Sequence, residues 1–423
     1  MTSNRDPGWK ALALGLPALC AGLAHTAHAE TTLTLPPIKV YGFLNAEIEA
    51  VEAKGGTTPY HRRGRVTDGN SRLGITGGIE ITPTTKAIWQ LEASLNSFDQ
   101  GGVNDRGESN TLTSRNSFIG IEDLRFGRVV IGNNDSAYRS LVGSGGALGG
   151  NLGLSSLGLD LWNNTTAQLT GNSYSLFGRG EARYKNSIHY TSAEWMGLQA
   201  AASYGFDEAR SNGLGHNRFS LAAKYKNGPL QLGLGFDQQS NTGVDIDNQE
   251  AGYGFRTHSQ QGVNTRFLKA VASYLLPTGT YLGLGVEQGR YGYSQFVPPS
   301  GTQIYPQVLT GQMKQTGVMA SIAQQVGANA TLMLSVGSLG KLGNATFGAT
   351  EDYKATQFSV GGKYRFNDYL SGYVYGTKIK NKSQQSVNLG QNPLYSVDVG
   401  NASAYLSPGD SPQAFGVGLI ASF

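Results

Sequence analysis

The stretch RLGITGGIEI at residues 72–81 decides the fold, because its side chains sort into two sets with a period of two. The odd positions carry Leu, Ile, Gly, Ile and Ile, whereas the even positions carry Arg, Gly, Thr, Gly and Glu. A β-strand points successive side chains to opposite faces, while an amphipathic helix needs a spacing of about 3.6 residues. The stretch therefore predicts a strand with one apolar face and one polar face.

The same alternation recurs along the chain in segments of about ten residues. Further segments cover residues 40–51, 86–96, 184–190, 198–206, 218–226, 230–237, 266–276, 281–288, 314–324, 331–338 and 357–366. Weaker candidates cover residues 114–121, 127–133 and 369–380. Together with the last segment of the chain, they predict about sixteen strands.

The connections between these segments alternate along the chain between short turns and long loops. Short turn-forming sequences lie at residues 82–85, 227–229, 277–279 and 367–368, and long polar ones at residues 54–70, 134–175, 239–265, 290–312 and 381–412. Short periplasmic turns opposite long extracellular loops are typical of outer-membrane barrels. A soluble sheet of this length would have to split into sandwiches to bury its apolar faces. We therefore predict an all-β fold, a transmembrane antiparallel β-barrel.

The N-terminal residues have the features of a cleaved export signal. Arg5 and Lys10 flank the start of an apolar run at residues 11–23, and the sequence AHA at 27–29 is a small-x-small cleavage site. The predicted organisation is a signal peptide at residues 1–29 and a barrel at residues 30–423.

Composition excludes several function classes. The only cysteine, Cys20, lies in the predicted signal, so the predicted mature chain has no thiol for a disulfide or a metal site. After Glu30 no run of about 18 apolar residues occurs, so no transmembrane helix is predicted. The formal net charge of +4 comes without a basic run, and nucleic-acid binding is not expected.

The chain ends in an alternating segment that closes on an aromatic residue. Phe415, Val417, Leu419 and Phe423 share its apolar face. A terminal phenylalanine on such a strand is similar to the signal read by the outer-membrane barrel assembly machinery. Phe423 is therefore the predicted assembly signal, and that machinery is an expected partner.

With these features the sequence resembles the Gram-negative general porins over nearly the whole predicted mature chain. The resemblance rests on VYGFLNA at 40–46, SRLGI at 71–75, KAIWQLE at 86–92, RNSFIGI at 115–121, FGRVVIG at 126–132, KNSIHY at 185–190 and FGVGL at 415–419. It implies a sixteen-stranded trimeric barrel in the cell outer membrane, with a water-filled channel for passive diffusion. Asn133, Ile420 and Ala421 depart from the family, which commonly has basic residues at these places.

A barrel of this width leaves an aqueous channel, so function depends on what narrows it and which charges line it. The connection at residues 134–175 is similar to the porin loop that folds into the lumen, and loops this long are normally functional or disordered. An acidic loop opposite a basic wall would give a transverse field and a weak preference for anions. The predicted pore-lining and constriction residues are Arg72, Arg115, Asp135, Asp160, Arg183, Lys185, His189, Lys363 and Arg365.

Motifs for catalysis are not found. Residues 143–148 nearly match a dinucleotide-binding loop but end in Leu148 where glycine is needed. The histidines outside the predicted signal lack metal-ligand spacing. We predict no catalytic residues, no metal and no cofactor. The expected partners are outer-membrane lipid, small hydrophilic solutes and ions, and further copies in a homotrimer.

Two other functions stay open. One is a substrate-selective channel for sugars or organic acids, in which Tyr138, Trp162 and Tyr174 on the long loop form a stacking track. The other is an outer-membrane barrel enzyme such as a lipase, or an adhesin that uses the long loops.

Overall fold

The computed structural model describes most of the chain after residue 37. The described residues are 38–57, 59–68, 71–95, 112–143, 176–208, 210, 213–250, 254–259, 262–297, 307–344, 350–389, 394 and 406–423. The predicted signal peptide at residues 1–29 lies outside them. Within these ranges, no helix has both the length and the apolar character needed to cross a membrane.

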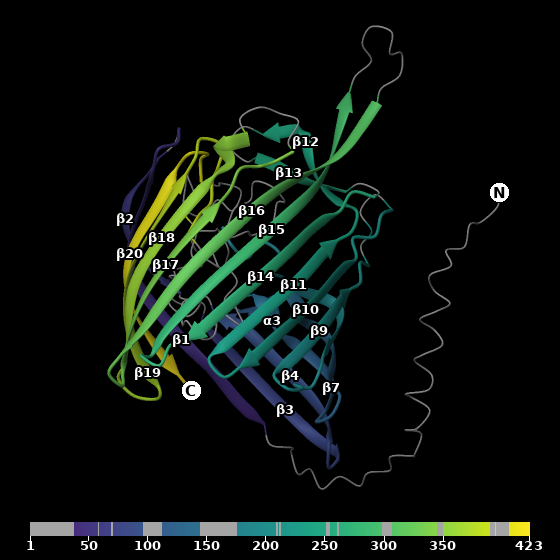
Figure 1. The fold of residues 1–423 in the computed structure, drawn as a ribbon, viewed down its shortest axis with the longest axis vertical. Helices are drawn as coiled ribbons and strands as arrows, with labels where there is room; N and C mark the ends of the chain where they lie inside the picture. Colours follow the sequence, from purple (N-terminus) through teal and green to yellow (C-terminus); the bar gives the residue numbers. More distant parts are fainter. Residues whose placement is uncertain are drawn as a thin grey trace, which may run out of the picture. The chain divides into compact units, whose positions relative to one another are not determined.

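The described residues form one sheet of 20 strands (Figure 1). Sixteen of them pair antiparallel with their neighbours around a ring, which closes where β1 pairs with β20. The predicted sixteen-stranded barrel is therefore confirmed. The ring strands are β1 (Lys39–Lys54), β3 (Arg72–Thr82), β4 (Thr85–Leu95), β6 (Ser117–Asp123), β7 (Gly127–Asp135), β8 (Arg183–Thr191), β9 (Leu198–Gly205), β10 (Arg218–Asn227), β11 (Leu230–Gln239), β14 (Thr265–Leu275), β15 (Thr280–Val297), β16 (Gln307–Val326), β17 (Ala330–Leu339), β18 (Ala355–Arg365), β19 (Leu370–Asn381) and β20 (Ser411–Ser422).

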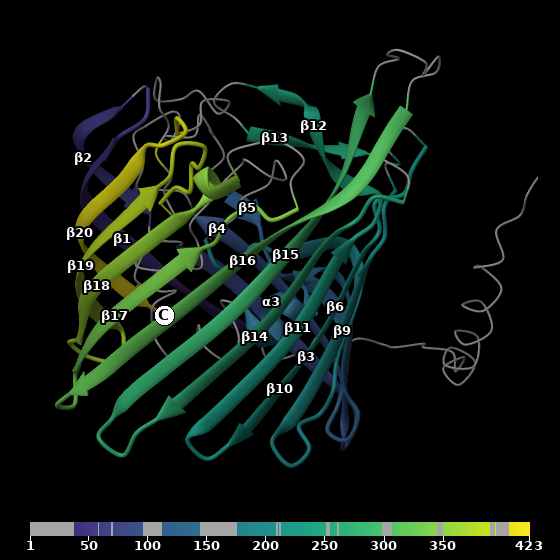
Figure 2. The same cartoon turned by 45° about the horizontal axis from the view of Figure 1, so that its top comes forward.

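Three of the remaining strands, β2 (Tyr60–Asp68), β12 (Thr242–Glu250) and β13 (Gly254–Ser259), lie where long loops were expected. β2 pairs with β1 inside the predicted loop at 54–70, and β12 pairs with β13 inside the one at 239–265. β5 (Leu112–Ser114) pairs with β4. β15 and β16 also continue far into the predicted loop at 290–312, as a long hairpin (Figure 2). These predictions were wrong because hydrophobic alternation marks only the part of a strand that meets lipid, whereas backbone pairing continues beyond it.

The two faces of the wall differ as the alternation predicts. Large apolar side chains such as Ile79, Leu91 and Ile119 are exposed on one face, where they meet lipid. Polar and charged side chains such as Glu92 and Lys269 are enclosed on the other face. The inner face therefore carries the groups that can meet solutes.

Tyrosine side chains stabilise the closure of the ring between β20 and β1. Gly418 of β20 leaves room for the Tyr373 ring of β19, since a Cβ there would lie 2.3 Å from Tyr373 Cζ. The Tyr373 hydroxyl crosses β20 and donates to Glu47 Oε2 of β1 at 2.7 Å. Tyr375 reaches Glu49 of β1 in the same way. Phe423 bonds through its backbone to Gly42, so the chain end is part of this closure.

Candidate functional site

The long connection after β7 starts with a short helix on the inner wall. α3 (Ala137–Val142) begins after Ser136, whose hydroxyl accepts from the backbone N–H of Arg139. The N–H groups of Ala137 and Tyr138 donate to Ser203 Oγ and Ser220 Oγ on the wall, at 2.9 and 2.8 Å. Because wall serines satisfy the helix N-terminus, this end of the loop is held inside the ring.

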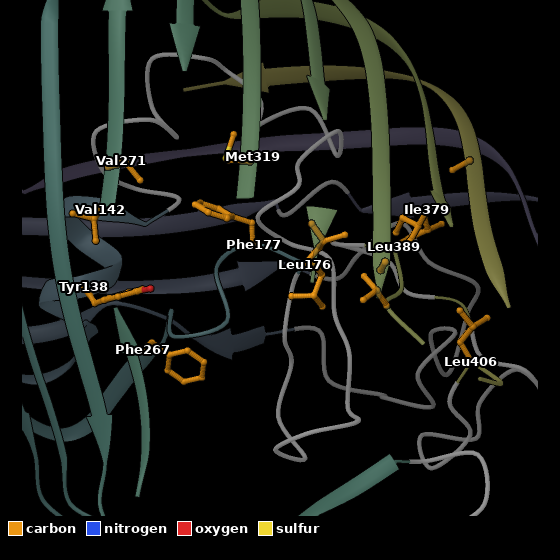
Figure 3. Close-up of a cluster of buried hydrophobic side chains, with 14 of the residues drawn as sticks. Tyr138, Val142, Leu176, Phe177, Phe267, Val271, Met319, Ile379, Leu389 and Leu406 are labelled. Carbon is orange, nitrogen blue, oxygen red and sulfur yellow. The ribbon is translucent and has the colours of Figure 1, made fainter. Parts of the chain in front are cut away.

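The wall is shaped to receive this helix. A Cβ on Gly235 of β11 would lie 2.4 Å from Val142 Cγ2, and one on Gly233 would lie 2.8 Å from Val142 Cγ1. The absence of side chains at these two inner positions lets the helix approach the sheet closely. Figure 3 shows Tyr138 and Val142 beside Val271 of the neighbouring wall.

The loop returns to the wall at residues 176–182, where Leu176 and Phe177 are completely buried. A Cβ on Gly285 of β15 would lie 2.5 Å from Phe177 Cζ. Figure 3 shows Phe177 between Met319 and the helix residues, with Leu176 toward Leu389 and Ile379. Both described ends of the loop therefore pack inside the barrel, and the middle of the loop, residues 144–175, lies outside the described residues.

One wall carboxylate joins the two ends of the loop. Glu287 of β15 accepts from the Tyr138 hydroxyl at 2.6 Å, and from the N–H of Arg179 at 2.9 Å and its Nε at 3.1 Å. Lys269 Nζ of β14 lies 3.3 Å from Glu287 and 2.9 Å from Glu181. We call Tyr138, Arg179, Glu181, Lys269 and Glu287 the loop anchor. Its four charges balance, as charges in a dry interior must.

The Tyr138 hydroxyl donates to Glu287, and the Tyr138 ring lies 5.0 Å from Lys269 Nζ. Burial, reinforced by the charge of Glu287, raises the pKa of Tyr138 well above its usual value. The hydroxyl therefore keeps its proton and its bond to Glu287 at any physiological pH.

The loop anchor continues into later loops. Arg179 Nη2 donates to the backbone oxygen of Gln315 on β16 at 3.0 Å, and Gln315 Nε2 donates to the backbone oxygen of Tyr353 at 3.0 Å. Tyr353 ends a short 3-10 helix (Thr350–Tyr353), and Gln385 Nε2 from the last long loop donates to the same oxygen at 2.6 Å. Three loops are thus connected by buried hydrogen bonds along one side of the wall.

A second charged group lies near the first end of the loop. Arg115 Nε is 2.7 Å from Glu92, while Arg139 and Arg183 share Asp135 Oδ1 at 2.8 and 3.0 Å. Arg72 stacks on Phe43 at 4.7 Å and is paired in register with Ser94, whose hydroxyl accepts from Arg115 at 3.1 Å. We call this set the arginine cluster: Arg72, Arg115, Arg139, Arg183, Glu92 and Asp135.

Among the residues that the structure describes, the charges of the arginine cluster do not balance. Its four guanidinium groups face two carboxylates, and Glu181 reaches Arg139 only at 3.8 Å. Arg139, Arg183 and Asp135 keep 21–22% of their side chains exposed. An excess of positive charge is therefore in contact with solvent inside the barrel.

Comparison with known proteins assigns the family. The sequence model described as Gram-negative porin matches residues 13–390. The chain belongs to this family. It is a porin of the Gram-negative outer membrane and forms a water-filled channel for the passive diffusion of small hydrophilic solutes.

The porin has distant relatives of similar length and fold. It is 24% identical over 391 residues to an outer membrane porin protein of Bordetella pertussis, covering 86% of this chain and 93% of the relative. It is 26% identical over 245 residues to the major outer membrane protein P.IB of Neisseria meningitidis serogroup B, with 54% and 62% of the two chains covered. The anion-selective porin from Comamonas acidovorans has the same fold, with a TM-score of 0.64, 18% identity and 92% and 99% of the chains covered.

Four of the predicted constriction residues of this porin lie together. Arg72, Arg115, Asp135 and Arg183 are all members of the arginine cluster. The expected division into an acidic loop and a basic wall is not found among the described residues, because Asp135 pairs directly with Arg183 and the loop residue Arg179 pairs with Glu287 of the wall. Asp160 lies outside the described residues.

The other predicted residues lie elsewhere. Lys185 is exposed beside Asn186, whose φ of 47° interrupts the alternation of β8. His189 is buried between Ser187 Oγ and Ser203 Oγ, both at 2.7 Å, so it supports the wall serine under α3. Lys363 is on the inner face of β18, and Arg365 lies at the following turn, 3.7 Å from Asp368. A role for any of them in the channel stays a prediction.

The structure also locates Asn133, Ile420 and Ala421, the three residues that depart from the family pattern. Asn133 donates to the backbone oxygen of Arg115 at 2.6 Å and thus borders the arginine cluster. Ile420 is buried on the inner face of β20, whereas its neighbour Ala421 is exposed on the opposite face. Of these two residues near the chain end, only Ile420 faces the lumen.

Sequence reasoning missed the loop anchor. The alternation of residues 281–288 does place Glu287 opposite Leu282, Leu284 and Val286, and this signal could have marked Glu287 as an inner residue. Lys269 shares its face with the apolar Phe267 and Val271, so alternation does not mark it. Nothing in the sequence shows that a loop covers them.

The stacking track and metal chemistry have little support in the described part of the chain. Tyr138 is fully buried, so its ring cannot line a solute path, and Trp162 and Tyr174 lie outside the described residues. Within the described ranges no group of three or more metal-ligating side chains occurs. The family and fold are those of channels rather than enzymes.

Proposed function

We propose that the solute path passes the arginine cluster and that the porin weakly prefers anions. The observation that carries the proposal is that, among the described residues, four arginines lie together with two carboxylates, and that Arg139 and Arg183 are partly exposed inside the barrel. Positive charge in a channel wall raises the local concentration of anions and lowers that of cations. The effect is modest because neighbouring carboxylates offset part of the charge.

We also propose that the working unit is a homotrimer without catalytic activity. A trimer form has been described for the outer membrane protein OmpT of Vibrio cholerae, which shares the fold at a TM-score of 0.57 and 15% identity. Lipid hydrolysis by the purified protein would contradict the absence of catalysis.

Planar bilayer recordings with purified protein test both points. We expect a reversal potential of the sign for anion preference in a tenfold KCl gradient, and closures that come in three equal steps. A reversal potential of cation-selective sign would contradict the role of the arginine cluster. Single-step closure would contradict the trimer.

A further inference from the structure

The turn that follows β1 packs against the segment that precedes β20, at the long-loop end of the barrel. The N–H of Gly56 donates to Asp410 Oδ1 at 2.7 Å, across 354 positions of sequence. A Cβ on Gly56 would lie 2.9 Å from Asp410 Cγ and 2.6 Å from the backbone oxygen of Pro408, so this contact needs a residue without a side chain. The contact joins the first and the last long loop where the ring closes.

A tight turn fixes the position of Asp410. Pro408 and Gly409 form the centre of the turn, and the N–H of Asp410 donates back to the oxygen of Ser407 at 3.0 Å. Proline at the second position, followed by a φ of 84° at Gly409, is typical of a type II turn. Asp410 directly precedes β20, so the turn holds its backbone on one side and the sheet on the other.

The Asp410 carboxylate is buried without a compensating charge among the described residues. The residue is 0% exposed, and Oδ2 accepts no hydrogen bond in the part of the chain that the structure describes. Burial raises the pKa of the Asp410 carboxyl, and the N–H of Gly56 offsets this only in part. A buried carboxylate without a counter-charge is strongly unfavourable, so a cation is the expected partner.

A second buried oxygen lies beside Asp410. Asn381, the last residue of β19, donates through Nδ2 to the backbone oxygens of Asp410 and Val387, at 2.7 and 2.8 Å. Turning the amide over would place its oxygen against these two oxygens, so the orientation of the amide is fixed. Asn381 Oδ1 is buried and, among the described residues, accepts no hydrogen bond. Two neighbouring residues therefore each keep one buried oxygen as a free acceptor.

The oxygens at this contact are of the kinds that calcium binds. Ca²⁺ takes about six to eight oxygen ligands from carboxylates, Asn side chains and backbone carbonyls, in a flexible geometry. Asp410 and Asn381 supply two side-chain oxygens, and backbone oxygens can supply others. A Cβ on Gly55 would lie 2.9 Å from the oxygen of Gly409, and one on Gly409 would lie 3.6 Å from the oxygen of Gly55. An irregular set of this kind suits Ca²⁺ better than Mg²⁺, which needs near-ideal octahedral geometry.

We propose that a calcium ion binds between the turn after β1 and the segment before β20, with Asp410 Oδ2 and Asn381 Oδ1 as its side-chain ligands. The ion neutralises the buried carboxylate and ties the first long loop to the last one. A site with one carboxylate is weak, with a Kd of about 10⁻⁴–10⁻³ M, as in extracellular calcium modules. It shares no residue with the loop anchor or the arginine cluster, so it does not depend on the proposed ion preference.

Equilibrium dialysis with ⁴⁵Ca²⁺ tests the site. The protein is refolded without lipopolysaccharide, because lipid phosphates also bind divalent cations. The charge variant is Asp410→Asn, the neutral-ligand variant is Asn381→Ala, and the matched control is Glu351→Gln, which changes an exposed carboxylate of another loop. We expect one calcium ion per chain in the wild type and the control. Binding should be at least tenfold weaker in Asp410→Asn and about threefold weaker in Asn381→Ala, because ligand charge dominates calcium affinity.

Thermal unfolding gives a second measurement that does not rest on bound radioactivity. With millimolar calcium the wild type should unfold at a higher temperature than Asp410→Asn. With EDTA the order should reverse, because the variant no longer buries an uncompensated charge. A purely structural role of Asp410 would give the same order in both solutions and would overturn the proposal.

Other outcomes would also overturn it. These are a wild type that binds no calcium, an Asp410→Asn variant that binds it as tightly as the wild type, and an equal loss in Glu351→Gln. Equal binding of Mg²⁺ would overturn the assignment to calcium. A wild type that ignores calcium but becomes more stable as the pH falls would show that a proton neutralises Asp410 instead. Single-channel conductance equal to that of the wild type confirms that the variants are folded.

Discussion

The loop anchor joins both ends of one loop and the arginine cluster lies near its first end, and these two charged groups differ in burial and in the balance of their charges. In the loop anchor, the side chains of Lys269 and Glu287 are 0% exposed and that of Arg179 is 1% exposed. In the arginine cluster, Arg139 and Arg183 keep about a fifth of their side chains exposed. The comparison teaches that the same residue types either hold the loop or meet the solute, depending on whether water reaches them.

The physical reason is the cost of moving charge out of water. A buried charge must be paired completely, because an unpaired one costs several kcal/mol. Because of this requirement, the loop anchor strongly constrains the position of both loop ends on the wall. A partly exposed charge is screened by salt and can remain in excess, so the arginine cluster can act on passing ions.

Replacing the central carboxylate of the loop anchor should have the largest effect. Glu287→Gln leaves Lys269 and Arg179 without their shared negative charge. We expect the free energy of unfolding, measured by urea titration in detergent, to fall by about 3–5 kcal/mol. Because Glu287 joins both ends of the loop, single-channel currents should also become noisier.

Glu351→Gln is the matched control for this change. Glu351 pairs with Lys341 and Lys354 in a loop, but all three side chains are exposed. The free energy of unfolding should therefore hardly change. An equal loss in both variants would remove the distinction between buried and exposed pairs.

Tyr138→Phe should have an intermediate effect on the same quantity. It removes one hydrogen bond to Glu287 and leaves the ring, the charges and the other donors in place. A hydrogen bond to a charged group contributes about 1.5–3 kcal/mol, and the remaining donors to Glu287 put the expected loss near the lower figure. A loss as large as that of Glu287→Gln would show that this one hydrogen bond, rather than the charge pairing of Glu287, holds this end of the loop.

Removing the exposed charges of the arginine cluster should have the smallest effect when it is expressed as a free energy. It should nevertheless change the ion selectivity of the channel directly. For Arg139→Gln with Arg183→Gln, we expect the anion-to-cation permeability ratio to fall roughly twofold at low salt, or about 0.4 kcal/mol. At about 1 M salt the difference should nearly vanish because the Debye length shrinks to about 3 Å.

Lys185→Gln is the control for the arginine cluster, since Lys185 was predicted on the same strand but lies outside the cluster. It should change the permeability ratio less than the double variant does. An equal change in the permeability ratio would mean that any cation of the wall influences selectivity and that the arginine cluster does not determine it.

The candidate site could be predicted from sequence where alternation is unbroken. Arg72 begins β3, in which the period of two is unbroken, whereas Arg115 lies between β5 and β6 and pairs with Glu92 from there. Lys185 was harder to place, because the left-handed φ at Asn186 shifts the alternation in β8. The predicted loops at 54–70 and 290–312 were partly strand, because pairing beyond the membrane leaves no hydrophobic signal.

By itself the sequence determined the barrel and the family. Alternation is a local property that can be recognised in each strand without knowledge of the others, and it recurs in about sixteen strands. The sequence also predicted a set of charges that point inward, and that set stays a prediction. Only the tertiary structure decided which of these charges are buried, because burial depends on a loop that returns to strands far along the chain. Tyr138 and Glu287 are 149 positions apart, and their contact makes one inner carboxylate an anchor while Asp135 stays partly in water.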